Sequence, residues 1–260
     1  MEKITVEEKE YLLLIGLNRP EKMNAFDLDM YMELAEALGR LDRSDNLRCG
    51  VLFAHGKNFT SGLDMIKWVD VFSSGQFPEL PDRFCDPFGL DEERRVSKPL
   101  VMAAQGICYT VGLELMLAAD VRVAAKDTRF GQIEVKRGIY PVGGATVRLH
   151  EEIGWGNAMR YLLTGDEITA EEAYRLGLVQ ELTEPGEQFE RAMALAGAVA
   201  EQAPLGVRAS LLSARLARRE GEAKAISRLL PDLLPIMKSE DAQEGVISFI
   251  ERRKAIFKGK

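Results

Sequence analysis

The sequence predicts an α/β protein in which short buried strands alternate with helices, followed by a helical region. Four apolar runs, at 11–17, 50–54, 100–104 and 121–125, have the length and composition of buried strands. After about residue 165 the apolar residues follow the helical period instead. A chain of 260 residues can bury a substantial core in one domain with an appended region.

An amphipathic helix is predicted between the first two strands. Asp27 is suited to cap its N-terminus, because a carboxylate can accept hydrogen bonds from the free amides of a first helical turn. The apolar residues that follow recur three or four apart, which places them on one face of the helix. They are Met30, Tyr31, Leu34, Ala35, Leu38 and Leu41.

Residues 67–97 interrupt this pattern with glycine, prolines and scattered phenylalanines. We expect an irregular segment here. A long irregular segment in a compact domain is usually functional or mobile. Our interpretation is a variable lid or a wall of a substrate pocket.

The last third of the chain predicts a series of helices. Thr169 and Glu172 form a capping box at the start of one helix, and Gly177 supplies its stop. Further helices are expected at 186–202, 204–219, 222–237 and 240–256, with Pro231 and Pro235 kinking the third. These helices cannot all cover the α/β body, so we expect some of them to pack on a neighbouring subunit.

Composition argues against several classes of protein. The net charge of −7 disfavours a general attraction to nucleic acid or to an anionic membrane. No apolar run approaches the roughly 18 residues of a membrane span, and no apolar targeting segment is expected. Cys49, Cys85 and Cys108 show no metal-ligand spacing, with each other or with the two histidines. We expect a cytoplasmic protein without a metal site, in which Cys49 and Cys108 are buried in strands.

Two glycine-bearing turns each follow a predicted strand. Residues 58–65 follow the strand at 50–54 and lead toward a helix, and residues 110–114 follow the strand at 100–104 in the same way. Strand-to-helix turns present free backbone N–H groups at the positive end of a helix dipole. Two of them on adjacent strands could direct two amides at one developing oxyanion. Two ordinary turns remain the alternative, because short glycine motifs have little specificity.

Two glutamates lie in unusually apolar surroundings. Glu114 follows Gly-Leu and precedes Leu-Met-Leu-Ala-Ala, and Glu134 follows Phe-Gly-Gln-Ile. Burial of a carboxylate is costly and raises its pKa, which suits a group that holds or moves a proton near neutral pH. The alternative is a structural acid tied to a helix N-terminus or an arginine.

An ordered set of motifs resembles the crotonase (enoyl-CoA hydratase/isomerase) superfamily along nearly the whole chain. The most informative are Phe-Thr-Ser-Gly-Leu-Asp at 59–64, Gly-Leu-Glu-Leu at 112–115 and Phe-Gly-Gln-Ile-Glu at 130–134. Each motif is weak alone, and their ordered sum is specific. The others lie at 18–25, 98–99, 105–106, 119–120, 138–141, 143–144, 163–165, 170–173, 177–179 and 244–253.

The resemblance implies a spiral of repeated ββα units over residues 1–200 and a helical trimerisation region over 201–260. It also implies a homotrimer, or a hexamer built as a dimer of trimers. The substrate would be an acyl-CoA thioester whose carbonyl oxygen binds to the backbone amides of Leu63 and Val111. Coenzyme A is then part of the substrate, and no separate cofactor is implied.

The two glutamates then acquire roles. Two carboxyl groups in one dry pocket cannot both ionise cheaply, so we expect their pKa values to split into a base and an acid. We assign Glu114 to the water that attacks C3 and Glu134 to the proton at C2. The activity implied is syn hydration of a 2-enoyl-CoA to a 3-hydroxyacyl-CoA.

Several alternatives stay open at this point. One is a Δ3,Δ2-enoyl-CoA isomerase with Glu134 as its sole base. Another is a silent acyl-CoA-binding paralogue, suggested by Leu63 where alanine is commoner and Val111 where the loop is usually glycine-rich. Val142 lies where dienoyl-CoA isomerases carry an aspartate, which argues against that activity. A hydrolase built on Ser61 would need His55 or His150, and neither shows an orienting partner.

The resemblance also supplies candidate substrate-binding positions. For several other residues a structural role is expected instead. Asp64 should stabilise the first turn of the helix behind Leu63, and Asp120 should make a turn or cap. Phe130, Trp155 and Tyr161 are expected in the core. The candidates for contact with the acyl group or CoA are Lys22, Asn24, Ala25, Ser61, Gly62, Asp64, Met65, Gly112, Tyr140, Pro141 and, toward a neighbouring subunit, Phe257 and Lys258.

Overall fold

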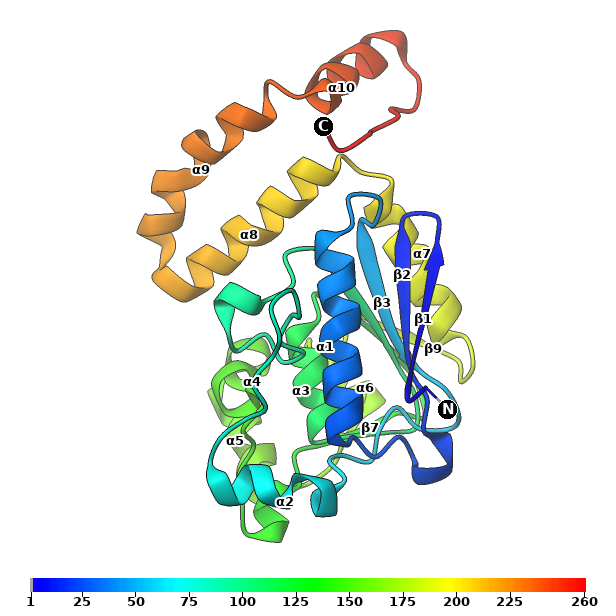
Figure 1. Cartoon of the computed structure of the whole chain (residues 1–260), viewed down its shortest axis with the longest axis vertical. Coiled ribbons are helices and arrows are strands. Elements are labelled where there is room, and N and C mark those ends of the chain that lie inside the picture. Colours follow the sequence, from blue (N-terminus) through cyan, green and yellow to red (C-terminus); the bar gives the residue numbers. More distant parts are fainter. Residues whose placement is uncertain (1) are drawn as a thin grey trace.

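The computed structural model describes residues 2–260 and is built on one six-stranded sheet (Figure 1). Strand β1 is antiparallel to β2, and every later neighbour pair in the sheet is parallel. The spatial order is β1(Ile4–Lys9), β2(Leu12–Leu17), β3(Cys49–Ala54), β4(Leu100–Ala104), β6(Val121–Ala125) and β9(Glu181–Thr183). The four predicted strands are confirmed as β2, β3, β4 and β6.

Both faces of this sheet are covered by helices (Figure 1). Helix α1(Leu28–Arg43) packs its apolar stripe into the larger core, and Asp27 caps it by accepting from the Met30 amide at 3.1 Å, as predicted. Helix α7(Gln188–Ala200) covers the other face with Ala192, Ala196 and Ala200, whose small side chains let it lie close to the strands. Parallel strands covered on both faces are apolar along their whole length, which is why the predicted runs did not alternate.

A smaller second sheet runs beside the first. It contains β5(Ile107–Tyr109), β7(Arg129–Gly131) and β8(Ile168–Thr169), and a single bridge adds Thr60 beside Cys108 of β5. The chain therefore passes from β3 to Thr60, from β4 to β5 and from β6 to β7, and keeps the same spatial order in both sheets. The first two passages lead into α2(Met65–Ser74) and α3(Val111–Ala118), and the third into a 3₁₀ turn, η3(Glu134–Arg137). This is the predicted spiral of strand–strand–helix units.

The remaining helices follow the sheets. Helix α4(Ala145–Ile153) and α5(Trp155–Thr164) come next, and α6(Ala170–Arg175) begins where Thr169 accepts from the Glu172 amide at 3.2 Å. Gly177 then adopts a positive φ of 82°, which confirms the predicted stop. The body also contains two short 3₁₀ turns, η1(Pro20–Lys22) and η2(Glu92–Arg94).

Three C-terminal helices extend from one end of the body (Figure 1). They are α8(Pro204–Glu220), α9(Glu222–Ile236) and α10(Glu240–Glu251). Helix α9 continues through Pro231 and Pro235, and α10 ends before the predicted residue 256 because Arg252 adopts a left-handed conformation. Many large apolar side chains of α9 and α10 are exposed, including Leu230 at 70% and Phe249 at 84%.

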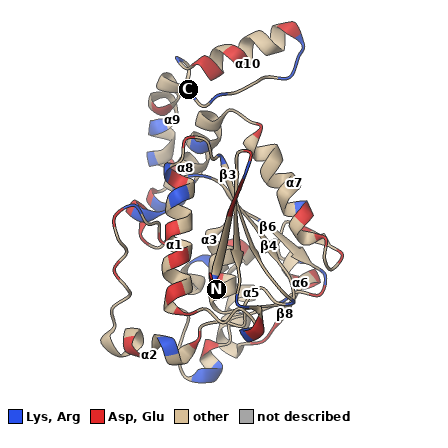
Figure 2. Ribbon diagram, turned by 45° about the vertical axis from the view of Figure 1, so that its right-hand side comes forward, with Lys and Arg blue, Asp and Glu red and all other residues tan. Residues whose placement is uncertain are grey.

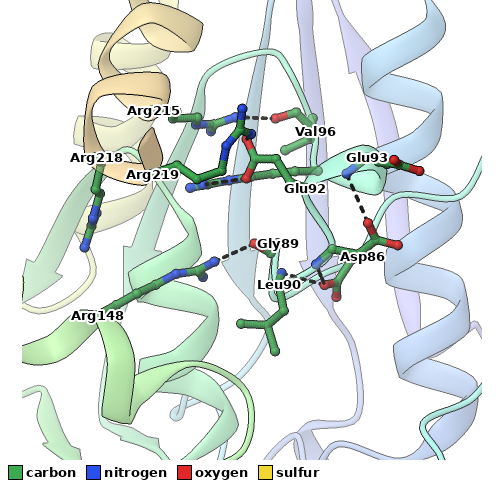
Figure 3. A network of polar contacts seen from close by, with 12 residues as sticks. Asp86, Gly89, Leu90, Glu92, Glu93, Val96, Arg148, Arg215, Arg218 and Arg219 are labelled. Carbon is green, nitrogen blue, oxygen red and sulfur yellow. Dashed lines mark hydrogen bonds and ion pairs between the residues drawn. The ribbon is translucent and has the colours of Figure 1, made fainter. Parts of the chain in front are cut away.

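Arginines tie α8 and α4 to the chain segment at 86–96 (Figure 3). Arg215 of α8 donates to the Val96 carbonyl at 2.6 Å and pairs with Asp120 at 2.9 Å. Asp120 also accepts from the Leu100 amide at 2.9 Å, so the predicted turn residue is an anchor between β4 and α8. Arg148 of α4 donates to the Phe88 and Gly89 carbonyl oxygens.

Other differences from the sequence expectations concern one helix, one strand and one side chain. Residues 67–74 are helical within α2, because Trp68 is fully buried and donates to the Phe26 carbonyl at 2.9 Å, which stabilises that helix against the body. Strand β1 was not predicted, because its polar residues resemble those of a surface loop. Trp155 is 67% exposed at the start of α5, whereas Phe130 and Tyr161 are buried as predicted.

Charged side chains lie mainly on the outer faces of helices and in loops, and the main-sheet strands carry few (Figure 2). Cys49, Cys85 and Cys108 are free and buried. Within residues 2–260, no helix has both the length and the apolar character needed to cross a membrane.

Candidate active site

A single cavity of about 750 Å³ collects both predicted turns and both predicted glutamates. Its walls come from α2 and the turn before it, from the start of α3, and from the segment that runs through η3 to residue 142. Apolar side chains make most of the surface. The lining residues are Ser61, Gly62, Leu63, Met65, Val69, Phe72, Ser73, Thr110, Val111, Glu114, Ile133, Glu134, Arg137, Gly138, Ile139, Tyr140, Pro141 and Val142.

The first turn presents the amide of Leu63. The amide of Phe26 donates to the Gly62 carbonyl at 2.8 Å, and the amide of Asp64 donates to the Phe26 carbonyl at 2.9 Å. These two hydrogen bonds pair Leu63 with Phe26 in a parallel β-bridge. The Leu63 amide faces away from Phe26, and within residues 2–260 it donates to no protein group. Leu63 therefore offers a free N–H at the cavity wall.

The second turn presents the amide of Val111. Thr110 takes the unfavourable conformation, with φ 48° and ψ −109°, so that Val111 can begin α3. A β-branched residue rarely adopts a positive φ. Here Thr110 adopts the positive φ and Val111 does not. The Val111 amide is in the first turn of α3, has no partner among the described residues and faces the cavity with the positive end of the helix dipole. This turn follows β5, and not β4 directly as the sequence suggested.

The two turns are locked to each other. The Thr60 amide donates to the Ile107 carbonyl at 3.0 Å, and the Tyr109 amide donates to the Thr60 carbonyl at 3.1 Å. A side chain at Gly62 would overlap the Thr110 hydroxyl, and one at Gly112 would come within 2.7 Å of the Thr60 methyl group. Each turn thus places a threonine where the other must lack a side chain, which fixes the spacing of the two free amides.

Glu114 is 5% exposed on the first turn of α3. Burial raises its pKa from an ordinary 4.5 to about 7, against the opposing effect of hydrogen bonds from the Ala145 and Gly143 amides and the charge of Arg148. Those amides donate to Oε1 at 3.3 and 2.7 Å. A side chain at Gly143 would overlap the carboxylate, so glycine is required for this contact.

Glu134 lies at the start of η3 on the other wall of the cavity. Burial raises its pKa to about 7, its own backbone amide lowers the pKa, and the nearby Glu114 raises it further. Gln132 lies against this carboxylate, and its amide nitrogen, when turned toward Glu134, lies 2.8 Å from Oε1 and 3.0 Å from Oε2. In the opposite orientation the same nitrogen faces the Thr110 carbonyl at 3.4 Å.

Both pKa values are raised to about 7, so they do not by themselves distinguish the base from the acid. Their hydrogen bonds differ instead. Two backbone donors can only favour the ionised form of Glu114. The Gln132 amide can turn to donate to an ionised Glu134 or to accept from a protonated one.

The structure gathers part of the predicted substrate-binding set. Ser61, Gly62, Met65, Tyr140 and Pro141 line the cavity with the amides and glutamates. The cavity lining does not include Lys22, Asn24, Ala25, Asp64, Gly112, Phe257 or Lys258.

Three of the residues outside the cavity have structural contacts that explain their place. Asn24 is buried and donates to the His55 and Asn58 carbonyls, both at 2.9 Å. Asp64 is the N-cap residue of α2, next to the first turn as predicted; its side chain makes no capping hydrogen bond and pairs with Arg19 at 2.9 Å. Gly112 packs against Thr60.

Sequence reasoning missed the α2 wall and the cation in η3. Val69, Phe72 and Ser73 were placed in an irregular segment, so their shared helical face was not considered. Arg137 carried a usable signal, because it stands three residues after Glu134 and three residues complete one turn of a 3₁₀ helix.

Neither histidine supports a hydrolase site. His55 Nε2 is 2.8 Å from the Thr5 hydroxyl, His150 packs near Trp155, and neither lines the cavity with Ser61. Within residues 2–260 there is also no cluster of three or more side chains suited to hold a metal ion.

Comparison with known proteins agrees with this geometry. The family model described as enoyl-CoA hydratase/isomerase matches residues 7–260. A solved structure of a probable enoyl-CoA hydratase/isomerase from Mycobacterium abscessus is 46% identical with a TM-score of 0.96, and the match covers 100% of this chain and 99% of that one.

Curated relatives match over similar lengths. An enoyl-CoA hydratase of Mycobacterium tuberculosis is 33% identical over 98% of this chain and 96% of its own. A crotonyl-CoA hydratase of Syntrophomonas wolfei is 31% identical over 98% of both. The chain belongs to the enoyl-CoA hydratase/isomerase family.

Proposed function

We propose that this protein hydrates a 2-enoyl-CoA to a 3-hydroxyacyl-CoA. One observation carries the proposal: a buried and a half-buried carboxyl group, both with raised pKa values, line the same cavity as two backbone amides that have no partner within residues 2–260. The carbonyl oxygen of the thioester binds between the Leu63 and Val111 amides, which stabilise the charge of an enolate. Removing one such donor typically costs on the order of 10²–10³ in rate.

The two acids then divide the reaction. Ionised Glu114, held by the Gly143 and Ala145 amides, takes a proton from water as the water oxygen bonds to C3. The electron pair of the double bond moves into the enolate, and protonated Glu134 gives its proton to C2. Water has been added across the bond on the face shared by both acids, a syn addition, and proton exchange with solvent returns the acids to their starting forms.

This chemistry supports an active protein over a silent paralogue. Leu63 and Val111 supply only backbone N–H groups, and both amides have no partner among residues 2–260 despite their side chains. Water addition exchanges no electrons, so the proposed reaction needs no redox cofactor, and coenzyme A enters as part of the substrate.

The experiment compares two substrates by the absorbance of the conjugated thioester. Crotonyl-CoA suits it because a relative bears the name crotonyl-CoA hydratase. Wild-type protein should consume crotonyl-CoA, and Glu114→Gln and Glu134→Gln should each lose on the order of 10²–10⁴ in rate. An isomerase would instead produce the absorbance from a 3-enoyl-CoA with Glu134 alone, and insensitivity to Glu114→Gln would replace our proposal with that activity.

We also propose that the protein works as a trimer or as a dimer of trimers. The support is the row of exposed apolar side chains on α9 and α10, which exceeds the isolated exposure normal for a monomer. The C-terminus, which in sequence is near Phe257 and Lys258, lies at the opposite end of the molecule from α2 (Figure 1). Any contact they make with CoA must therefore be with that of a neighbouring subunit.

A further inference from the structure

Among the described residues, one cationic side chain lines the substrate cavity. Its charged lining residues are Glu114, Glu134 and Arg137, and only the glutamates have a part in the proposed reaction. Most of the remaining surface is apolar. The proposed hydration at C2 and C3 gives this arginine no role.

The backbone directs Arg137 toward the same cavity as Glu134. Both belong to η3, which begins at Glu134 and ends at Arg137. Side chains three residues apart in a 3₁₀ helix lie one above the other, with an axial separation of about 6 Å. Arg137 therefore stands one turn beyond the proton donor, on the same face of η3.

The Arg137 guanidinium has no partner within residues 2–260. It forms no ion pair within 4.0 Å and no hydrogen bond, whereas the preceding Lys136 lies 3.9 Å from Asp166. Ser73 and Tyr140, which carry hydroxyl groups, also line the cavity. Arg137 is exposed, so its guanidinium is open to a ligand that enters the cavity. Arginine presents a planar fork of donors that matches a carboxylate or a phosphate.

We propose that Arg137 binds a second oxyanion of the acyl-CoA substrate. That oxyanion is either a carboxylate at the far end of the acyl chain or a phosphate of coenzyme A, and the two share the same recognition chemistry. The inference rests on the proposed function, because it takes the cavity to be an acyl-CoA site. If the oxyanion is a carboxylate, the substrate class is a dicarboxylic enoyl-CoA monothioester.

Binding of saturated ligands tests the inference without turnover. Calorimetry would compare adipyl-CoA, hexanoyl-CoA and hexanoyl-pantetheine on wild-type protein, Arg137→Gln and Arg137→Lys. Lys136→Gln is the matched control, since it removes the neighbouring positive charge from a residue outside the cavity lining. Thermal unfolding of each variant verifies that it is folded.

A carboxylate partner predicts that Arg137→Gln weakens adipyl-CoA binding by about 10- to 100-fold, the usual range for a charged hydrogen bond. The loss would be confined to that ligand, with Arg137→Lys in between. A phosphate partner predicts an equal loss for both CoA esters and none for the pantetheine ester. A loss below twofold on every ligand, or the same loss in Lys136→Gln, overturns the inference. Absence of hydration with intact binding would count against the proposed function alone.

Discussion

At the scale of single residues, the site depends on placing two acids where neither ionises easily. Glu114 and Glu134 both have pKa values raised mainly by burial, and the second is raised further by the first. One ionised and one protonated carboxyl is then the favoured state near neutral pH. Hydration needs that state, with a base for water and an acid for C2.

Glu114 should make stability depend on pH. Its pKa in the folded protein, about 7, lies above the ordinary 4.5, so folding favours the protonated form. The stabilisation is full below about pH 4.5 and is lost as pH rises through 7. Glu114→Gln should therefore gain stability over wild type by up to ~3 kcal/mol at pH 8, and by much less at pH 5. Urea unfolding at both pH values measures this, and an equal difference at both would contradict it.

Thr110 should destabilise the protein in two separable ways. Its positive φ is strained, and its hydroxyl is buried without a hydrogen-bond partner among the described residues, each costing about 1–3 kcal/mol. Thr110→Gly removes both costs and Thr110→Val only the hydroxyl. Urea unfolding at fixed protein concentration should therefore rank glycine above valine and valine above wild type. A glycine variant less stable than wild type would mean that contact with Gly62 outweighs the strain.

At the scale of elements, prediction succeeded where the local sequence decides the structure. The apolar runs gave β2, β3, β4 and β6, and Asp27 and Thr169 each cap the expected helix. It failed where distant contacts decide. Helix α2 depends on Trp68 reaching Phe26, and β1 is defined by pairing with β2.

The site shows the same division. Motifs identified both glutamates and both amide-bearing residues, because those groups are fixed by short sequence patterns. The interlock of Thr60 with Gly112 and of Thr110 with Gly62 joins segments about fifty residues apart in the chain, which no local pattern reveals. The structural contacts of Asn24 were not foreseen for a similar reason, since its side chain bonds to the distant His55 and Asn58.

The anchor between α8 and the body should be a strong stability determinant. Arg215 is buried and bonds both Val96 and Asp120, so Arg215→Met leaves Asp120 without its cation. Breaking such a buried pair typically costs about 3–5 kcal/mol. Arg219→Gln is the control, because its pairs with Glu92 and Glu220 are exposed and worth at most about 1 kcal/mol. Equal losses in denaturant unfolding would contradict this account of the anchor.

At the scale of the whole molecule, the C-terminal helices are the part whose apolar surface remains uncovered in a single chain. Helices α8 to α10 extend from the body, and the apolar faces of α9 and α10 are left exposed (Figure 1). Burying that surface in a homo-oligomer is the proposed solution, because a patch of this kind usually marks an interface.

Light scattering after size exclusion tests the oligomer. Wild-type protein should have the mass of a trimer or hexamer, and replacing Leu230 and Leu234 by glutamate should shift it toward the monomer because charges would enter the apolar interface. Leu163→Glu is the control, since Leu163 is exposed on α5, away from these helices. A wild-type monomer, or a double variant with unchanged mass, would contradict the proposal.

The central claim is that Glu114 and Glu134 act together on one conjugated thioester, with Glu114 delivering water. The most direct measurement is uptake of ¹⁸O from labelled water into crotonyl-CoA, followed by mass spectrometry. Wild-type protein should yield 3-hydroxybutyryl-CoA carrying one solvent oxygen, and Glu114→Gln should lose at least on the order of 10² in that rate. No uptake by wild type, or uptake by Glu114→Gln at the wild-type rate, would contradict the account.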